Sequence, residues 1–273
     1  MNNYKIIASD LDGTLLNNAS AVSPENLDAI KALTDKGVYF VPCSGRTFCE
    51  IPAEIRENEH IRYIIHSNGA VVLDKQTGYR ILTCIPNTLG RKVMELLTAC
   101  ETHITIRHNG QNHVDARFQT DKDFVYYNVI EAHQDCVLNY GALEDDFLKL
   151  ACEADNVEVY SAFFHSYEEK LACRERLQAL GGLRIVEASE YNLEIMNVEA
   201  GKGNALYALC DLLGVDYAET ISVGDSDNDS SVTQAAGLGL AVENACDSLK
   251  AVADEIICSN EDHAVVYVLN HYF

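Results

Sequence analysis

The sequence predicts an α/β protein with a doubly wound parallel sheet as its core and a second, inserted α+β domain. Two observations indicate this class. Short apolar runs rich in β-branched residues alternate with helical patterns over residues 6–65 and again over residues 191–257. Between these two series the pattern changes to hairpins and helices. Strand–helix alternation is typical of a parallel sheet that helices cover on both faces.

The first series begins with the apolar run Ile6-Ile7-Ala8-Ser9, which is short enough for a buried strand. A helix should follow at residues 24–36, because Ser23 can cap it, Pro24 suits its first turn and Gly37 suits its end. The series continues with a strand, a helix and a strand, expected at residues 38–42, 47–58 and 63–65.

The middle of the chain has a different pattern. Residues 70–73 and 80–82 are expected to form one hairpin, and Asn109-Gly110 is a strong turn signal for another, with strands at 104–107 and 113–114. Helices are expected at residues 88–100, 121–133, 141–154 and 167–180, and a strand at 158–164. We therefore assign residues 84–186 to the inserted domain and residues 1–83 and 187–273 to the core.

The second series returns to strand–helix alternation. Its strands are expected at residues 191–198, 220–223, 239–242 and 255–257. Its helices are expected at residues 203–213, 230–235 and 246–253. Both series are therefore expected to contribute to the core.

The composition excludes several classes of protein. The chain has 273 residues, of which 48 % are hydrophobic, and a formal net charge of −22. Binding to nucleic acid requires clustered Lys and Arg, so we expect neither a nucleic-acid partner nor an anionic membrane surface. No stretch has the roughly 20 apolar residues that span a bilayer, and the first strand begins too early for a signal peptide. We expect a cytoplasmic monomer or homodimer.

Cysteine and histidine give no sign of a metal or disulfide framework. The ten cysteines are scattered from Cys43 to Cys258 without a CxxC pair. We expect reduced, mostly buried thiols, with a nucleophilic Cys43 as the alternative. The nine histidines show neither HxH nor HExxH spacing, so a histidine metal site is not expected.

Asp10 and Asp12 stand where the first predicted strand ends and Gly13 marks a turn. Side chains alternate along a strand, so the two carboxylates start on the same side, roughly 7 Å apart at Cα. Such a pair is repulsive unless a cation or a shared proton intervenes. The pair therefore indicates metal-assisted chemistry at a strand end, where open α/β sheets bind ligands. Turn residues without chemistry are the alternative.

Three further polar groups follow predicted strands or open predicted helices. They are Ser44-Gly45-Arg46, Lys202 and the acidic cluster from Asp225 to Asp229. A single carboxylate pair says little by itself, but four such elements in this order indicate one shared site. A helix cap at Ser44 and a solvated surface lysine at Lys202 are the structural alternatives.

These residues match known motifs. Asp10-Leu11-Asp12-Gly13-Thr14 resembles the first motif of the haloacid dehalogenase superfamily, which has a Rossmann-like core. Ser44, Lys202 and Gly224-Asp225-Ser226-Asp227-Asn228-Asp229 resemble its second, third and fourth motifs. The insertion between the second and third motifs resembles the type IIB cap domain of the Cof-type sugar phosphatases. Two positions depart from the family pattern, Ser230 in place of an apolar residue and His263 in place of glycine.

The resemblance implies a Mg²⁺ ion held by the side chains of Asp10 and Asp225 and by the backbone carbonyl of Asp12. Asp10 is then the nucleophile that forms an aspartyl-phosphate. Asp12 is the acid that protonates the leaving alcohol and the base that activates water. Lys202 adds a positive charge beside the phosphoryl group, and Asp229 is expected to hold Lys202 in place.

The resemblance also implies donors that bind the substrate phosphate. They are the side chain of Ser44 and the backbone amides of Leu11, Gly45 and Asn228. Arg46 is expected either to contact a substrate oxygen or to form a structural ion pair. Thr14 should support its loop by hydrogen bonding, and Asp227 is expected to be a turn residue or to support the residues that bind the metal.

The expected function is Mg²⁺-dependent hydrolysis of small phosphorylated metabolites, with sugar phosphates as the best candidates. A phosphomutase is the alternative among enzymes, and a non-catalytic binder of a phosphorylated metabolite is the alternative outside them. Asp12 argues against a dehalogenase, because a halide leaving group needs no proton donor. An intact set of Asp10, Asp12, Lys202 and Asp225 favours an enzyme over a binder.

Overall fold

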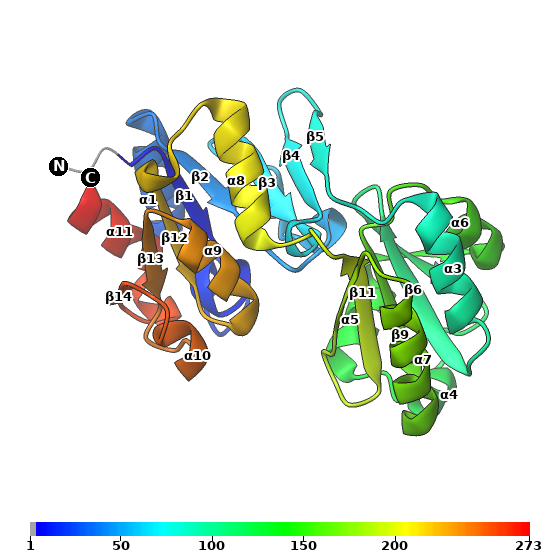
Figure 1. Ribbon diagram of the computed structural model, residues 1–273. Helices are drawn as coiled ribbons and strands as arrows, with labels where there is room; N and C mark the ends of the chain where they lie inside the picture. Colours follow the sequence, from blue (N-terminus) through cyan, green and yellow to red (C-terminus); the bar gives the residue numbers. More distant parts are fainter. Residues whose placement is uncertain (1–3) are drawn as a thin grey trace. The chain divides into compact units, whose positions relative to one another are not determined.

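The computed structural model describes residues 4–273, which divide into two compact units. The core unit comprises the chain up to Arg46, Ile51–Ile81 and Gly201–Phe273, and the inserted unit comprises Leu82–Ala200 with the short segment Thr47–Glu50. Figure 1 shows the core unit mainly in blue and in yellow to red, and the inserted unit mainly in green. Residues 1–3, the first of the five that precede the expected first strand, lie outside the described residues. Over residues 4–273, no helix combines the length and apolar character needed to cross a bilayer.

The core unit is built on a sheet of five parallel strands in the order β14-β13-β12-β1-β2. β1 is an inner strand, with Ile6 opposite Thr220 on one side and Tyr39 on the other. All of its residues are buried, as in a sheet covered on both faces. Because the strands run in the same direction, the carboxyl ends of β1, β2 and β12 lie next to one another. The strands are β1 Ile6–Ser9, β2 Tyr39–Pro42, β12 Thr220–Gly224, β13 Leu238–Ala241 and β14 Glu255–Ile256.

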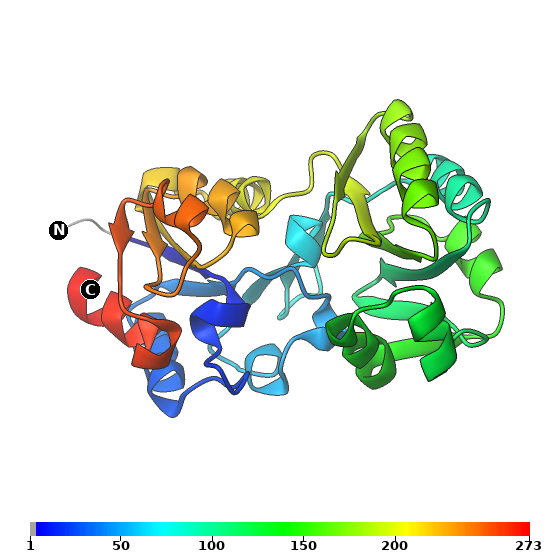
Figure 2. The ribbon, with the colours of Figure 1, turned by 90° about the horizontal axis from the view of Figure 1, so that it is seen from below.

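Helices cover both faces of this sheet, α8 and α9 on one face and α1 and α11 on the other (Figure 2). Under α8, Ile6, Leu206 and Leu209 belong to one buried apolar cluster. Ser23 caps α1 by accepting a hydrogen bond from Asn26 N, which confirms the expected start of that helix. The doubly wound α/β core is therefore confirmed. The helices are α1 Pro24–Asp35, α8 Lys202–Leu213, α9 Ser230–Ala235, α10 Asp247–Lys250 and α11 Ala264–Tyr272.

A second sheet of three strands is formed by β3 Tyr63–His66, β4 Val71–Asp74 and β5 Arg80–Leu82. The sequence predicts β3 as one more parallel strand of the core, but β3 pairs antiparallel with β4. A parallel bridge from Cys43 to Ile65 links it to the end of β2. The hairpin expected between residues 70 and 82 is present as β4 and β5.

The helix expected at residues 47–58 is wrong. The structure has a single turn at Phe48–Glu50 and a short helix, α2, at Ala53–Arg56. Pro52 lies between them. Proline has no N–H to donate and disfavours helical conformation in the residue before it, so one continuous helix cannot form here.

The segment Thr47–Glu50 packs with the inserted unit, although the chain on both sides of it belongs to the core unit. The buried Glu158 accepts a hydrogen bond from Thr47 Oγ1 at 3.1 Å and another from Gly110 N at 2.7 Å. Gly110 has φ +75°, and a Cβ there would lie 3.0 Å from Phe48 Cβ. Glycine at this hairpin turn therefore allows the close approach of the segment.

The inserted unit contains a six-stranded sheet in the order β10-β11-β9-β6-β7-β8, antiparallel except for the pair β7–β8. Ile106, Tyr160 and Leu193 pack with α3, α6 and α7 in an apolar cluster on one face. Phe163 points to the opposite face and packs with Phe124 in a smaller cluster. The strands are β6 Thr102–His108, β7 Gln111–Asp115, β8 Gly141–Glu144, β9 Val159–Phe164, β10 Leu183–Val186 and β11 Asn192–Asn197. The helices are α3 Asn87–Leu97, α4 Asp121–Tyr126, α5 Glu131–Tyr140, α6 Phe147–Glu153 and α7 Tyr167–Ala179.

Three elements of the inserted unit differ from expectation. The single helix expected at 121–133 is divided between α4 and the first residues of α5. The strand expected at 191–198 is present as β11, but it pairs antiparallel with β9 and β10 and not with the core sheet. The inserted unit accordingly extends from Leu82 to Ala200, where the sequence suggests 84–186. Alternation along a strand defines its two faces and not its partner, so periodicity could not assign this strand. The helix expected at 141–154 begins only at Phe147, because β8 occupies its first residues.

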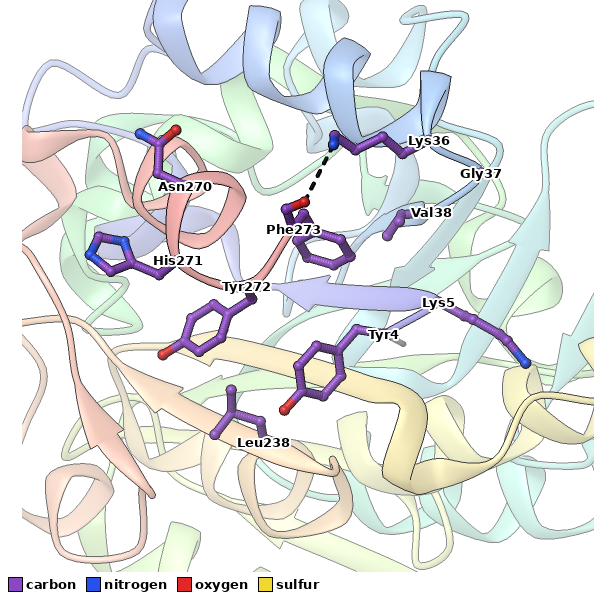
Figure 3. A pocket seen from close by; sticks show the side chains of 10 residues that line it. All are labelled: Tyr4, Lys5, Lys36, Gly37, Val38, Leu238, Asn270, His271, Tyr272 and Phe273. Carbon is purple, nitrogen blue, oxygen red and sulfur yellow. Dashed lines mark hydrogen bonds between the residues drawn. The ribbon is translucent and has the colours of Figure 1, made fainter. Parts of the chain in front are cut away.

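A cavity of about 790 Å³ lies in the core unit beside the amino end of β1 (Figure 3). Tyr4, Lys5 and Lys36 line it together with Tyr272 and Phe273. Lys36 Nζ donates to the backbone oxygen of Phe273 at 3.4 Å. The predicted site residues follow the carboxyl end of β1, so this cavity is separate from them.

Candidate active site

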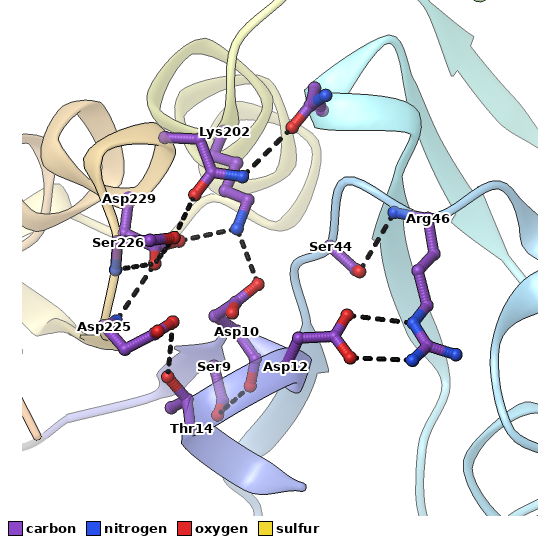
Figure 4. A network of polar contacts seen from close by, with 12 residues as sticks. Ser9, Asp10, Asp12, Thr14, Ser44, Arg46, Lys202, Asp225, Ser226 and Asp229 are labelled. Carbon is purple, nitrogen blue, oxygen red and sulfur yellow. Dashed lines mark hydrogen bonds and ion pairs between the residues drawn. The ribbon is translucent and has the colours of Figure 1, made fainter. Parts of the chain in front are cut away.

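Loops at the carboxyl edge of the core sheet bring the predicted site residues together (Figure 4). Asp10 directly follows β1, Ser44 comes two residues after β2, and Asp225 directly follows β12. Lys202 is the first residue of α8. The convergence follows from the fold, because β1 pairs in parallel with both β2 and β12.

Lys202 lies at the centre of the site. Its Nζ is 2.6 Å from Asp10 Oδ1 and 2.5 Å from Asp229 Oδ1, and its side chain is 1 % exposed. Burial by itself would lower the pKa of Lys202, but Asp10 and Asp229 raise it above its ordinary value. Lys202 is therefore a buried ammonium between two carboxylates, and the alternative of a solvated surface lysine is excluded.

Negative charge exceeds positive charge around Lys202. Burial raises the pKa of Asp10 well above its usual value, Lys202 opposes this effect, and Asp229 and Asp225 add to it. Burial and Asp229 also raise the pKa of Asp225. Three carboxylates share one ammonium here, so the site favours the binding of a further cation.

The donors at the site suit a hard divalent cation. One carboxylate oxygen from each of Asp10, Asp225 and Asp229 lies within 4.8 Å of the others. Oxygen ligands of this kind are those that Mg²⁺ prefers. Asp229 already uses Oδ1 for Lys202 and Oδ2 for the backbone N–H groups of Asp225 and Ser226, each at 3.1 Å. Asp10 and Asp225 are therefore the side chains that best fit a metal, and Asp229 organises the loop around them.

Asp12 does not join this carboxylate group. Arg46 donates from Nε to Asp12 Oδ2 at 2.9 Å and from Nη2 to Oδ1 at 2.7 Å. Of the two roles considered for Arg46, the structure has the ion pair. The side chain of Asp12 is 56 % exposed, against 7 % for Asp10, so the two carboxylates of the first motif occupy very different environments.

The backbone after Asp10 is shaped by Gly13. This residue has φ +72°, and a Cβ there would lie 2.6 Å from Asp225 Oδ2. Glycine is needed both for the turn and for the close approach of Asp225. Thr14 Oγ1 donates to Asp225 Oδ1 at 3.3 Å, which agrees with the supporting role expected for it. Asn244 Nδ2 donates to Gly13 O at 2.7 Å, a contact that the sequence did not suggest.

The predicted phosphate donors lie around the loop that contains Asn68. Ser44 is buried, its Oγ accepts from Arg46 N at 3.1 Å, and its carbonyl accepts from Asn68 N at 3.1 Å. Asn228 Nδ2 donates to Asn68 Oδ1 at 3.3 Å, and a Cβ on Gly45 would lie 3.0 Å from the same oxygen. Asn68 has φ +54°. Sequence analysis missed it as a site residue, although an Asn-Gly pair directly after a strand end is a turn signal.

The remaining predicted residues have clear positions. Leu11 is fully buried and begins the irregular turn Leu11–Leu15. Asp227 accepts a hydrogen bond from Ser248 Oγ, in line with a turn residue outside the carboxylate group. Cys43 is buried, and burial raises the pKa of its thiol far above the usual range, which argues against a nucleophilic cysteine.

A sequence profile of the haloacid dehalogenase-like hydrolases matches residues 7–269. The chain belongs to this family. The resemblance expected from its motifs is thereby confirmed.

Several haloacid dehalogenase-like proteins match the chain over their whole length. It is 29 % identical to Phosphatase YwpJ of Bacillus subtilis (strain 168), over 98 % of this chain and 99 % of that protein. A haloacid dehalogenase-like hydrolase from Bacteroides thetaiotaomicron has a TM-score of 0.81 at 23 % identity, over 99 % of this chain and 100 % of that one. One from B. subtilis has a TM-score of 0.77 at 27 % identity, over 98 % and 100 %. The expected class, a phosphoric monoester hydrolase, is confirmed by the family and by its phosphatase relatives.

One of the two departures from the family pattern has a structural explanation. His263 has φ +61°, in the left-handed region where glycine is at ease. Its Nδ1 lies 2.9 Å from Ser23 Oγ, and the residue stands directly before α11. His263 therefore adopts a backbone conformation that favours glycine, and its side chain makes a contact with Ser23 that glycine could not make. Ser230, the other departure, is the first residue of α9, and nothing in its surroundings explains the serine.

Proposed function

We propose that this chain is a Mg²⁺-dependent phosphatase that hydrolyses small phosphorylated metabolites, best represented by sugar phosphates, through an aspartyl-phosphate on Asp10. The observation that carries the proposal is the buried ammonium of Lys202 between Asp10 and Asp229. A phosphate monoester is an anion and cannot approach a carboxylate nucleophile without positive charge. Two like charges 4 Å apart repel by about 4 kcal/mol at an effective dielectric constant of 20.

Asp10 and Asp225 would hold the Mg²⁺ ion with their side chains, and Asp12 with its backbone carbonyl. The bound ion would neutralise the repulsion between the phosphate and the carboxylates. Nucleophilic attack and proton transfer are carried out by side chains of the protein.

Asp10 attacks phosphorus with a carboxylate oxygen, and the bond from phosphorus to the alcohol oxygen breaks. Lys202 donates to Asp10 Oδ1 and so fixes the direction of the nucleophile. Asp12 gives its proton to the departing alcohol, and in the second step takes a proton from the water that attacks the aspartyl-phosphate. The products are the alcohol, inorganic phosphate and free Asp10.

Arg46 takes part by holding Asp12. An ionised Asp12 accepts both hydrogen bonds from the guanidinium, whereas a protonated Asp12 keeps one oxygen as a donor. Taking up the catalytic proton therefore frees one carboxyl oxygen from Arg46. The ion pair sets the resting position from which Asp12 reaches the leaving group.

The substrate class is supported by two relatives. Two proteins of B. subtilis, YwtE at 28 % identity and YcsE at 26 %, are named 5-amino-6-(5-phospho-D-ribitylamino)uracil phosphatases. Their named substrate is a small molecule with a phosphorylated ribityl chain. Phosphate on a sugar or sugar alcohol is accordingly the class we propose for this chain.

The test is a panel of phosphate esters incubated with the purified protein and Mg²⁺. The panel contains hexose, pentose and polyol phosphates and p-nitrophenyl phosphate, and released phosphate is measured. We expect turnover by the wild-type protein and none by the Asp10→Asn variant. An isomeric sugar phosphate without released phosphate would identify a mutase instead. Binding of esters without any turnover would identify a non-catalytic binder.

A further inference from the structure

Two thiols in the inserted unit share one hydrogen-bond acceptor. Cys100 lies just after α3, and Cys173 lies in the middle of α7. Both donate to the carbonyl oxygen of Leu96, from Sγ at 3.6 Å and 3.8 Å respectively. Each thiol also affects the pKa of the other. The sulfur atoms of two different helical segments therefore lie against the same carbonyl oxygen, and all ten cysteines are free.

The two thiols differ in access to solvent. Cys173 is 1 % exposed and belongs to the apolar cluster that contains Val93 and Leu177. Cys100 is partly exposed and lines a cavity of about 270 Å³. Such a cavity has room for a small solute, so a reagent can reach Cys100, whereas Cys173 is buried and does not line the cavity.

The thiols also differ in acidity. Burial raises the pKa of Cys100, and the Cys173 thiol offsets part of this rise. Burial raises the pKa of Cys173 to about 12, and the Cys100 thiol adds to this effect. The charged groups near both are Glu169 and Arg176 of α7, which act in opposite directions. Cys100 is thus the thiol that ionises first, and thiolates are the reactive form.

We propose that Cys100 and Cys173 are a modification site at which a hydroperoxide drives formation of a reversible disulfide. In the first step the Cys100 thiolate attacks the distal oxygen of the hydroperoxide and the O–O bond breaks. Cys100 becomes a sulfenic acid, and the other oxygen takes up a proton and leaves as an alcohol or water. In the second step Cys173 attacks this sulfur with loss of its proton, and water leaves. A thiol reductant restores both thiols.

The disulfide connects the end of α3 to α7, two of the helices that cover the apolar face of the inserted sheet. It closes a loop from residue 100 to residue 173. Cross-links over long loops restrict the unfolded chain more than the folded one, so the oxidised protein should be the more stable form. The proposal involves neither the carboxylate site nor its chemistry, and it stands or falls independently of the phosphatase proposal.

The test uses the full chain and peptide mapping. Trypsin places each cysteine alone in its peptide, Cys100 in Val93–Arg107 and Cys173 in Leu171–Arg174. The native protein is treated with hydrogen peroxide, blocked with iodoacetamide and digested without reductant. We expect one linked peptide pair with the loss of two hydrogens, which dithiothreitol separates. The yield at early times should rise about tenfold per pH unit between pH 7 and 8, in proportion to the thiolate.

Control variants distinguish a specific disulfide between Cys100 and Cys173 from oxidation of cysteines in general. Cys100→Ser and Cys173→Ala should abolish the linked pair, and Cys152→Ser, at a partly exposed thiol on α6, should leave it intact. Oxidation should raise the melting temperature of the wild-type protein by about 5 °C and leave that of Cys100→Ser unchanged. Recovery of Cys100 as sulfinic acid with an alkylated Cys173 in the folded wild-type protein would overturn the proposal.

Discussion

The guanidinium of Arg46 donates a hydrogen bond to each carboxylate oxygen of Asp12, from Nε at 2.9 Å and from Nη2 at 2.7 Å. Two parallel hydrogen bonds of this kind fix the orientation of a carboxylate as well as its position. Asp10 is held differently, by the single ammonium of Lys202. The proposed nucleophile and the proposed acid are thus oriented by separate cations.

The ion pair between Arg46 and Asp12 leads to a prediction for the Arg46→Lys variant. Lysine keeps the charge but cannot make two parallel bonds, so Asp12 should lose its fixed orientation. We expect kcat to fall about tenfold with a smaller change in KM, since positioning effects of this size are common. Arg176→Lys, at a surface position of α7, is the matched control and should leave both parameters unchanged. A rise in KM alone would show that Arg46 contacts the substrate instead.

Asp12→Asn should affect poor and good leaving groups unequally. A sugar alkoxide needs a proton when it leaves, whereas p-nitrophenolate leaves without one. General acid catalysis contributes roughly 10²- to 10⁴-fold, so kcat for a sugar phosphate should fall by about that factor. The first step with p-nitrophenyl phosphate should be much less affected, which a burst of p-nitrophenol in rapid mixing would report. Equal losses of that first step for both esters would contradict an acid role for Asp12.

Asp10→Asn should abolish turnover and keep the fold. The variant removes the nucleophile, while Lys202 retains its contact with Asp229. It also removes one of three mutually repelling carboxylates, so the melting temperature should not fall. Phosphate release and thermal denaturation measure the two effects. Activity above about one tenth of the wild-type rate would exclude Asp10 as the nucleophile.

Metal removal should silence the enzyme, and Mg²⁺ should restore it. A ligand that binds the folded state also raises the melting temperature, so Mg²⁺ should stabilise the metal-free wild-type protein. Asp225→Asn should require a higher Mg²⁺ concentration for both effects. Asp227→Asn is the matched control, because Asp227 contacts Ser248 and lies outside the carboxylate group. Full activity after EDTA treatment and dialysis would contradict a metal requirement.

The inserted unit should lose stability in acid through His133. Burial lowers the pKa of His133 to about 3 from an ordinary value of 6.5, and Arg107 and His103 add to the shift. Between these values the unfolded chain binds a proton that the folded chain does not. The free energy of unfolding therefore keeps the full contribution of neutral His133 above pH 6.5. Below pH 6.5 it decreases by up to about 1.4 kcal/mol per pH unit. His133→Gln should show a shallower loss than the wild-type protein in urea denaturation from pH 6.5 to 4.5, and an equal slope would exclude His133 as the cause.

Much of the site could be predicted because it depends on a simple rule of the fold. Asp10, Ser44 and Asp225 each come at or just after the end of a strand, and parallel strands end at the same edge of their sheet. Once the strands were identified, the convergence of these residues followed. Lys202 needed the resemblance as well, because a lysine at a helix start has many ordinary explanations.

The missed features depend on contacts between distant parts of the chain. The side chains of Asn68 and Asn244 hydrogen-bond to Asn228 and Gly13, and a local sequence pattern does not reveal partners so distant in the chain. The partner of β11 was missed for a related reason, because a strand pattern is the same in either sheet. The break at Pro52 is different, because a proline is a local signal that the sequence itself carries.

The inserted unit consists of two separate stretches of the chain, because the four residues Thr47–Glu50 belong to it together with Leu82–Ala200. The bonds of these four residues to Glu158 and Gly110 mean that two stretches far apart in the gene must change together. A chimera that exchanges only Leu82–Ala200 between relatives would bring a foreign surface against Phe48. Exchange of the inserted unit by recombination therefore calls for two crossovers more than the connectivity of the chain suggests.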